Sequence, residues 1–249
     1  MLRVYSGDQK GATAFFRNRA LLDTLTKLLK ASPDRSERRM RILFHSASIG
    51  AEAFSFAIWC RMHGLDSQFA LEISATDINS EFLDFARTAL YPANVQQTMS
   101  AEEKAYFEDA GENEITPIEA IRRMVCFFPA MSFLEPISSV FDVVVVLNAL
   151  TYVSETEQSL AIHRIADYNR RYLVTTAFHP DTIEADLRQH GYVAVTDNIE
   201  AIHNGWTERL RPSPDAIRGT PEYSWVLPPF SPVPGFEYRF CSIFEKAAT

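Results

Sequence analysis

Two segments about thirty residues apart constrain the fold more than any other feature of this sequence. The first runs RILFHSASIGAEAFSFAIW from Arg41, and the second runs EISATDIN from Glu72 to Asn79. Each reads as a buried strand that ends in a small or acidic turn and then begins a helix. This layout is typical of the nucleotide-type cofactor site of an open α/β sheet. The two segments therefore predict an α/β fold with a doubly wound, mostly parallel sheet, and they make this chain a candidate enzyme.

The rest of the sequence continues the alternation of strands and helices. Capping boxes at Ser100 and Ser154 each mark the start of a helix, and Thr13 is a possible N-cap of the first helix. Helices are predicted over residues 14–29, 51–63, 80–89, 154–169 and 181–190. Strands are predicted from residue 41 and over residues 69–76, 125–130, 141–147, 171–177, 192–195 and 238–244.

The length and composition favour one main domain. A chain of 249 residues, of which 47% are hydrophobic, can bury one full core but is short for two large domains. We expect a leading helix and loop over residues 1–40 and the main domain over residues 41–249, with a small insertion near residues 100–124. Seven of the 13 prolines fall between Pro212 and Pro234, which predicts an irregular, proline-rich C-terminal lid near residues 201–236.

The turn after the first strand is built from small residues. Ser46, Ala47, Ser48 and Gly50 would allow a ligand to approach the backbone and the N–H groups of the next helix. Close packing of the helix on the strand explains the same residues equally well. The turn does not read GxGxxG, which argues against NAD or FAD as the ligand.

Asp77 ends the second strand, where a carboxylate can accept hydrogen bonds from the two vicinal hydroxyls of a ribose. We assign the neighbouring Ile78 to the same site. The alternative role for Asp77 is to cap the helix that begins near Ser80. An acidic residue here, beside a turn of small residues, favours an adenosyl ligand.

Four stretches occur in a fixed order: TAFFR from Thr13, SASIGAEAFS from Ser46, ATDINSEFLDFARTALY from Ala75 and FDVVVVLNALTYVSETEQ from Phe141. Together they resemble the catalytic domain of CheR-type chemotaxis receptor methyltransferases, from about Thr13 to Ala177. The resemblance implies a class I, Rossmann-like methyltransferase fold with a seven-stranded sheet and S-adenosyl-L-methionine as the cofactor. The cofactor-binding residues that it implies, together with those of the turn, are Thr13, Arg17, Ser46, Ala47, Ser48, Glu52, Asp77, Ile78, Ser132, Asn148 and Ala149.

The resemblance also implies that Arg17 and Tyr152 are the catalytic residues. A carboxylate acceptor, with an ordinary pKa of about 4.3, is already ionised and needs no general base. Arg17 would hold such a carboxylate and Tyr152 would orient it beside the transferable methyl group. A solvated arginine on a helix face is the alternative for Arg17. A hydroxyl or amine acceptor would need a base, for which His179 and His203 are the candidates.

The sequence departs from the family at several points. Ile49, Ala51 and Ala53 replace the polar and proline residues usual in the turn, and the helical domain that precedes the family's catalytic part is not expected here. We therefore expect an S-adenosylmethionine-dependent methyltransferase that acts on a small molecule or a carboxylate acceptor. The alternatives are a protein-glutamate O-methyltransferase of the chemotaxis receptor type and a non-catalytic, cofactor-binding regulatory module. Trp206, with Arg209 and Arg211, would bind an anionic or aromatic acceptor or anchor the tail.

Charge and cysteine content limit the partners. The formal net charge of -8 and the pI of about 5.3 disfavour a nucleic-acid partner. The longest apolar run, Val143 to Leu147, is too short to span a bilayer, and the first residues lack an apolar signal core. The three cysteines lie far apart and form no CxxC pair, which is typical of reduced thiols. We expect a cytoplasmic protein with no metal site, no membrane contact and no nucleic-acid partner, and the sequence does not indicate its oligomeric state.

Overall fold

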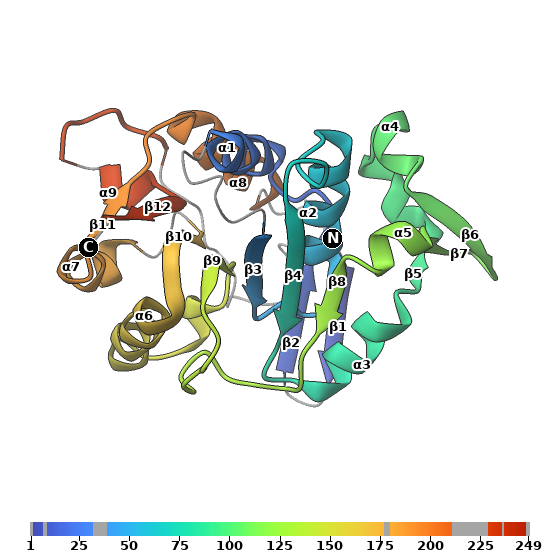
Figure 1. Ribbon diagram of the computed structural model, residues 1–249, viewed down its shortest axis with the longest axis horizontal. Helices are drawn as coiled ribbons and strands as arrows, with labels where there is room; N and C mark the ends of the chain where they lie inside the picture. The colour runs from blue at the N-terminus through green and yellow to red at the C-terminus, as the bar shows by residue number, and fades with distance from the viewer. Residues whose placement is uncertain are drawn as a thin grey trace, which may run out of the picture.

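A sheet of seven strands, mostly parallel, forms the centre of the fold (Figure 1). The computed structural model describes residues 2–6, 9–31, 39–176, 180–210, 229–235 and 237–247. The strand order is β11-β12-β10-β9-β3-β4-β8, and β12 is antiparallel to both of its neighbours. This order confirms the predicted doubly wound α/β fold. The strands are β3 Arg39–His45, β4 Ala70–Thr76, β8 Val125–Phe127, β9 Phe141–Val146, β10 Asn169–Thr175, β11 Tyr192–Ala194 and β12 Ile243–Lys246.

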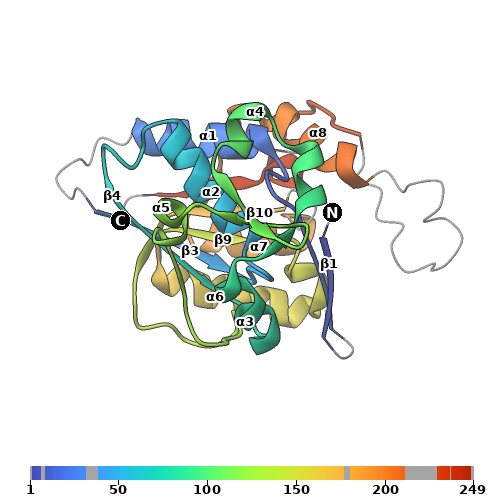
Figure 2. The same cartoon turned by 90° about the vertical axis from the view of Figure 1, so that its right-hand side faces the viewer.

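Helices cover both faces of the sheet. The sequence of β9, FDVVVV, suits a central parallel strand, because such a strand is buried on both faces and favours β-branched residues. Val143 and Val145 belong to the core under α1, α2 and α8, whereas Val144 and Val146 belong to the core under α6 and α7. Figure 2 shows α1, α2 and α8 on one side of the sheet and α6 on the other. The helices of two turns or more are α1 Arg19–Lys30, α2 Ala51–Met62, α3 Ser80–Thr88, α6 Glu155–Tyr168, α7 Pro180–Gln189 and α8 Ile199–Leu210.

The first helix begins later than predicted. The structure places Thr13 at the end of a hairpin, β1 Leu2–Ser6 and β2 Gln9–Thr13, and α1 begins only at Arg19. Phe16 adopts a left-handed φ of 49°, which breaks the helical path. Asn18 caps α1 by accepting a hydrogen bond from Leu21 N at 3.0 Å. The predicted helix start at residue 14 and the predicted N-cap at Thr13 are therefore wrong, and the hairpin was not predicted.

The end of the chain also differs from the prediction. Residues 201–210, predicted as part of an irregular lid, belong to α8, in which Ile202 and Trp206 are buried. Residues 211–228, which hold several of the prolines, lie outside the described residues. The predicted closing strand begins at Ile243, because Glu237–Phe240 forms the short helix α9.

A second, three-stranded antiparallel sheet stands beside β8 and α2 (Figure 1). Its strand order is β5-β7-β6, and the predicted capping box at Ser100 is confirmed at the start of the adjacent short helix α4. The second predicted capping box, at Ser154, begins α6. The elements of this region are β5 Tyr91–Pro92, η1 Ala93–Thr98, α4 Ala101–Lys104, β6 Phe107–Gly111, β7 Glu114–Pro117 and α5 Glu119–Arg122.

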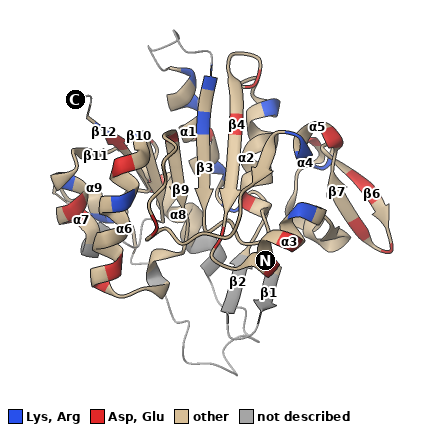
Figure 3. Ribbon diagram, turned by 60° about the horizontal axis from the view of Figure 1, so that its bottom comes forward, with Lys and Arg blue, Asp and Glu red and all other residues tan. Residues whose placement is uncertain are grey.

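Charged residues mark the amino ends of the central strands. Arg39 and Arg41, at the start of β3, form ion pairs with Glu72 of β4 (Figure 3). The opposite, carboxyl ends of the same strands carry the small and polar residues that the sequence singled out. In the part of the chain that the structure describes, no helix combines the length and apolar character that crossing a membrane requires.

Asn18 joins α1 to α8, and its loss is expected to destabilise the fold. Its amide Nδ2 donates to the Ile202 carbonyl at 2.7 Å, and Gly205 lies so close that a Cβ there would be 2.7 Å from Asn18 Oδ1. Asn18→Ala removes a helix cap and leaves the buried Ile202 carbonyl without this donor, so we expect a loss of about 2 kcal/mol in the free energy of unfolding. In Asn18→Ser the serine keeps a capping oxygen, but its side chain is too short to reach the Ile202 carbonyl. We expect this variant to lose about half as much free energy of unfolding as Asn18→Ala. Urea denaturation measures both, and an Asn18→Ala variant as stable as the wild type would contradict this role.

Candidate functional site

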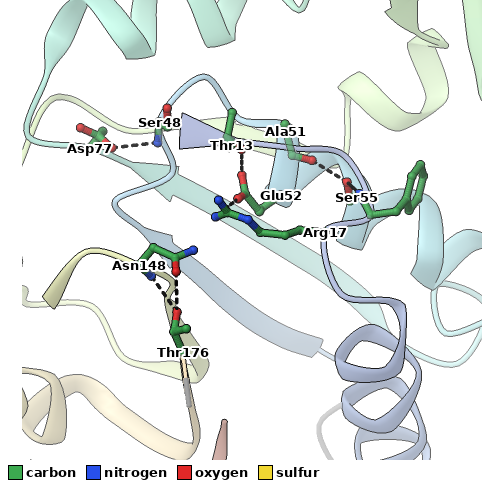
Figure 4. A network of polar contacts seen from close by, with 10 residues as sticks. Thr13, Arg17, Ser48, Ala51, Glu52, Ser55, Asp77, Asn148 and Thr176 are labelled. Atoms are coloured by element: carbon green, nitrogen blue, oxygen red, sulfur yellow. Dashed lines mark hydrogen bonds and ion pairs between the residues drawn. The ribbon is translucent and has the colours of Figure 1, made fainter. Parts of the chain in front are cut away.

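The carboxyl ends of β3, β4, β9 and β10 meet at one edge of the sheet, as parallel neighbours must. Most of the polar residues that the sequence assigned to a site lie at this edge (Figure 4). They fall into three groups, around Asp77, around Glu52 and around Asn148. The site therefore lies where ligands of open α/β sheets bind.

The turn between β3 and α2, residues 46–50, has an unusual backbone. Ser46 and Ser48 have left-handed φ angles of 66° and 50°, although neither is a glycine. Such residues cost free energy and tend to cluster at functional sites. Gly50 has a φ of 82°, and a Cβ there would lie 2.8 Å from Phe127 Cζ, so any other residue would strain the backbone and force the phenyl ring or the turn to move. The turn therefore adopts its tight backbone through Gly50 and two left-handed serines, without a GxGxxG motif.

Asp77 directly follows β4 and forms a hydrogen bond with this turn. Its side chain is 7% exposed, and its Oδ2 accepts a hydrogen bond from Ser48 N at 2.8 Å while its Oδ1 accepts one from Asn79 N at 3.0 Å. Burial raises the pKa of Asp77, against the opposite effect of these backbone N–H groups. Each carboxylate oxygen has a second lone pair that a ribose hydroxyl could use. The Ile78 side chain is 61% exposed beside it.

The alternative role for Asp77 is wrong. The N-cap of α3 is Asn79, whose Oδ1 accepts hydrogen bonds from Glu81 N at 2.9 Å and Phe82 N at 3.2 Å. Asp77 instead fixes the distance between the end of β4 and the β3–α2 turn.

Glu52, in the first turn of α2, is the centre of the second group. Thr13 Oγ1 donates to Glu52 Oε2, and Arg17 Nη1 lies 3.2 Å from Glu52 Oε1 (Figure 4). The side chains of Arg17 and Glu52 are only 10% and 14% exposed. Arg17 lies in the loop before α1, so the alternative of a solvated arginine on a helix face is wrong. The structure brings Thr13, Arg17 and Glu52 together.

Asn148 forms the third group at the end of β9. It has a left-handed φ of 54°, its N–H donates to Thr176 Oγ1 at 2.9 Å, and Thr176 Oγ1 donates to Asn148 Oδ1 at 3.2 Å. Ala149 is buried and directly precedes the short helix η2, Leu150–Tyr152. Sequence analysis missed Thr176, although its place directly after β10 puts it at the same edge.

Ser132 and Tyr152 are the remaining residues that the resemblance assigned to the site. Ser132 belongs to the loop after β8, which is tied to the site by a hydrogen bond from Met131 N to the Asp77 carbonyl at 2.9 Å. Tyr152 is 58% exposed. Among the described residues, Tyr152 lines neither of the two cavities at this edge.

The two cavities adjoin each other and share Glu52 in their walls. The polar cavity is lined by Ser46, Ala47, Ser48 and His45 of the turn and strand end, together with Glu52. The apolar cavity is lined by Arg17 and by apolar side chains that include Leu21 and Trp206. Ser48 Oγ is buried with no hydrogen-bond partner among the described residues. An unsatisfied hydroxyl beside a polar cavity fits a ligand with polar groups.

His45, the last residue of β3, was missed by sequence analysis. It is 1% exposed, and neither ring nitrogen has a hydrogen-bond partner among the described residues. Burial lowers its pKa to about 4, so the ring is neutral at pH 7. The signal in the sequence is a single polar residue at the end of the apolar run ILF.

The buried His45 ring makes stability depend on pH. The unfolded chain binds a proton at this side chain near pH 6.5, but the folded chain binds it only near pH 4. Stability is therefore full above pH 6.5 and is lost as the pH falls towards 4, and the His45 contribution between pH 7 and pH 5 is a loss of about 2 kcal/mol. Between pH 7 and pH 5, the His45→Gln variant should therefore lose about 2 kcal/mol less free energy of unfolding than the wild type. Urea denaturation at both pH values measures the difference, and equal losses in the two proteins would show that His45 is not buried in its neutral form.

Only one of the two candidate bases, His203, lies within the described residues. His179 lies outside the described residues. His203 is buried in α8, with its ring centroid 5.0 Å from that of Phe240, and it lines neither cavity. Trp206 is buried in the wall of the apolar cavity and its Nε1 donates to Ser242 Oγ at 2.9 Å, while the Arg209 side chain and Arg211 lie outside the described residues. Within the described ranges, no three His, Cys, Asp or Glu side chains are grouped as metal ligands.

Comparison with known proteins identifies relatives of most of the chain. The family model described as CheR methyltransferase, SAM binding domain, matches residues 11–174. Chemotaxis protein methyltransferase 1 of Vibrio cholerae is 27% identical over 163 residues, 62% of this chain and 58% of that protein. A chemotaxis protein methyltransferase of Campylobacter jejuni is 28% identical over 180 residues, 70% of this chain and 66% of that protein. The chain thus spans about three fifths of the length of such relatives.

The fold is also similar to those of solved methyltransferase structures, of which one has S-adenosylhomocysteine (SAH) bound. Magnesium protoporphyrin IX methyltransferase from Synechocystis, with bound SAH, has a TM-score of 0.44 and 14% identity to this chain. The match covers 74% of this chain and 80% of that one. This similarity is too distant to bear on the acceptor.

Proposed function

Because this chain belongs to the CheR methyltransferase family, through its SAM binding domain, we propose that it transfers a methyl group from S-adenosylmethionine to a glutamate side chain of a chemotaxis receptor. The relatives bear the name chemotaxis protein methyltransferase, which favours this alternative over the small-molecule acceptor expected first from the sequence. The acceptor then lies in the cytoplasm. Both the acceptor and the catalytic step belong to the proposal.

The residues at the sheet edge fit the cofactor. When bound, S-adenosylmethionine supplies an electrophilic methyl group on its sulfonium sulfur. Asp77 would accept hydrogen bonds from the ribose hydroxyls beside the turn that Ser48 N ties to its carboxylate. Glu52 would bind the ammonium group, since it is the one carboxylate among the described residues that line the polar cavity.

A carboxylate acceptor suits the chemistry of the described residues. The acceptor is ionised at pH 7 and needs positioning rather than a base. His203, the described candidate base, lines neither cavity, whereas Arg17 lines the apolar one. The presence of this arginine beside Glu52 is the observation that carries the proposal. Arg17 would hold the acceptor carboxylate in line with the methyl group.

The test is a methyl-transfer assay with two kinds of acceptor. The chain is incubated with S-adenosylmethionine carrying a labelled methyl group and with either receptor cytoplasmic fragments or a pool of small metabolites. The proposal expects label on the receptor fragments that alkali releases as methanol, because a glutamyl methyl ester is base-labile and a methylamine is not. Fragments with glutamine at the modified positions should take up no label. Alkali-stable label, or label only in the metabolite pool, would contradict it.

A second candidate is a non-catalytic module that binds S-adenosylmethionine. The 58% exposure of Tyr152, which lines neither cavity, favours it, because this residue was expected to face the methyl group. Cofactor binding without turnover on any acceptor, and no effect of Tyr152→Phe on binding, would support this candidate.

A further inference from the structure

Tyr91, at the start of the three-stranded sheet, forms a hydrogen bond with the β3–α2 turn. It is the first residue of β5 and pairs with Ile115 of β7. Its Oη donates to the Ile49 carbonyl at 2.6 Å, although the two residues are 42 positions apart. The Tyr91 side chain is fully buried, and burial raises the pKa of Tyr91, so the phenol is protonated and can donate at pH 7.

The ring of Tyr91 is held by aromatic neighbours on three other segments. Its centroid lies 4.8 Å from that of Phe15 in the loop before α1, 6.3 Å from that of Phe54 in α2 and 6.0 Å from that of Phe85 in α3. All three contacts have the edge-to-face geometry that aromatic pairs favour. This packing fixes the ring independently of its hydroxyl group, so Tyr91→Phe removes one hydrogen bond and leaves the ring in place.

The peptide group between Ile49 and Gly50 is held at both ends. Its carbonyl accepts from Tyr91, and its N–H donates to the Ala47 carbonyl at 2.9 Å. A rotation of this peptide group changes mainly the Ile49 ψ and the Gly50 φ, and glycine adopts negative φ angles about as readily as positive ones. The Tyr91 hydroxyl opposes such a rotation, because Ile49 is 1% exposed and its carbonyl would lose its donor where water has little access.

A rotated peptide would disturb both carboxylates that we assign to the cofactor. On one side of the peptide, Ser48 N donates to Asp77 Oδ2 at 2.8 Å. On the other side, the Gly50 carbonyl accepts from Phe54 N at 3.0 Å at the start of α2, and Glu52 lies in this first turn. The orientation of the peptide therefore sets where Asp77 and Glu52 lie relative to each other.

We propose that Tyr91 is a positioning residue for the cofactor, whose hydroxyl holds the Ile49–Gly50 peptide in the orientation that binds S-adenosylmethionine. This inference rests on the proposed function, which places the cofactor at this turn. Tyr91 does not touch the ligand and acts through the backbone of the turn. Its consequence is that the three-stranded sheet is linked to the cofactor site, because a displacement of β5 would release the turn.

The test is calorimetric titration of the full chain with S-adenosylhomocysteine. We expect Tyr91→Phe to weaken this ligand by about tenfold, because a turn that keeps the binding arrangement in about one molecule in ten raises the apparent dissociation constant by that factor. Tyr192→Phe is the matched control: the Tyr192 hydroxyl is buried, donates to Asn169 Oδ1 at 2.8 Å, and lines neither cavity. It should bind the ligand as the wild type does.

Two further measurements separate positioning from general loss of stability. Urea denaturation should show that Tyr91→Phe and Tyr192→Phe lose similar free energies of unfolding, since each loses one buried hydrogen bond. Replacing Tyr91 by p-aminophenylalanine restores a donor at the same place, although an aromatic amine donates more weakly than a phenol. The affinity of this protein for S-adenosylhomocysteine should lie between those of Tyr91→Phe and the wild type.

The outcomes distinguish this inference from the proposed function. If folded Tyr91→Phe binds S-adenosylhomocysteine within twofold of the wild type, or if Tyr192→Phe weakens it equally, the positioning role is wrong and the proposed function stands. If Tyr91→Phe does not fold, the p-aminophenylalanine protein decides: an affinity about threefold lower than that of the wild type is expected, and an equal affinity would contradict the role. If the folded wild type binds no S-adenosylhomocysteine at all, the proposed function fails.

Discussion

Asp77→Asn is expected to weaken the binding of S-adenosylhomocysteine by about 100-fold, since hydrogen bonds to a charged group contribute about 1.5–3 kcal/mol each and 1.4 kcal/mol is tenfold. The substitution keeps the shape of the side chain but removes the charge and one acceptor oxygen. It also turns an amide N–H towards Ser48 N or Asn79 N, both of which are donors. We therefore expect a loss of about 1–3 kcal/mol in the free energy of unfolding as well.

Calorimetry gives the affinity and urea denaturation gives the stability of this variant. Asp84→Asn is the matched control, because Asp84 is an exposed carboxylate on α3 that pairs with Arg87. Its affinity for S-adenosylhomocysteine should equal that of the wild type. An Asp77→Asn protein that is folded and binds the ligand within threefold of the wild type would show that Asp77 has only a structural role.

Gly50→Ala is expected to destabilise the fold by about 2–4 kcal/mol and to weaken cofactor binding. A left-handed alanine costs about 1 kcal/mol, and forcing a methyl group into a packed site costs about 1–3 kcal/mol more. The new Cβ would lie 2.8 Å from Phe127 Cζ and 3.3 Å from Ala86 Cβ, so either the β3–α2 turn or the phenyl ring must move. Movement of the turn would also displace Ser48 N from Asp77.

Gly111→Ala separates the two causes. Gly111 has a φ of 84°, almost the same as the 82° of Gly50, but a Cβ there would meet no atom within 4 Å. This variant should therefore lose only about 1 kcal/mol and should bind S-adenosylhomocysteine as the wild type does. Equal loss of stability in the two variants, measured by urea denaturation, would show that the close contact with Phe127 is unimportant.

Local chemistry explains which elements could be predicted from the sequence. The run FDVVVV predicts a central parallel strand because only such a strand is buried on both faces. The capping boxes at Ser100 and Ser154 predict helix starts because both partners of each box lie within four residues. Asp77 was assigned to the site from its position at a strand end.

Tertiary contacts explain the elements that the sequence did not predict. Phe16 N donates to Ser55 Oγ, 39 residues away, at 2.8 Å, and this contact holds the left-handed residue that delays the start of α1. In α8, Ile199, Ile202, His203 and Trp206 have helical spacing, but the nearby prolines favoured an irregular prediction. His45 was missed because its burial depends on Phe133 and on strands distant in sequence.

The central claim is that this edge of the sheet binds an adenosyl cofactor through Asp77 and Glu52. Calorimetric titration of the native full chain with S-adenosylhomocysteine tests it most directly. The account predicts saturable binding of one equivalent per chain. A folded protein that releases no heat of binding, at ligand concentrations up to the millimolar range, would contradict it.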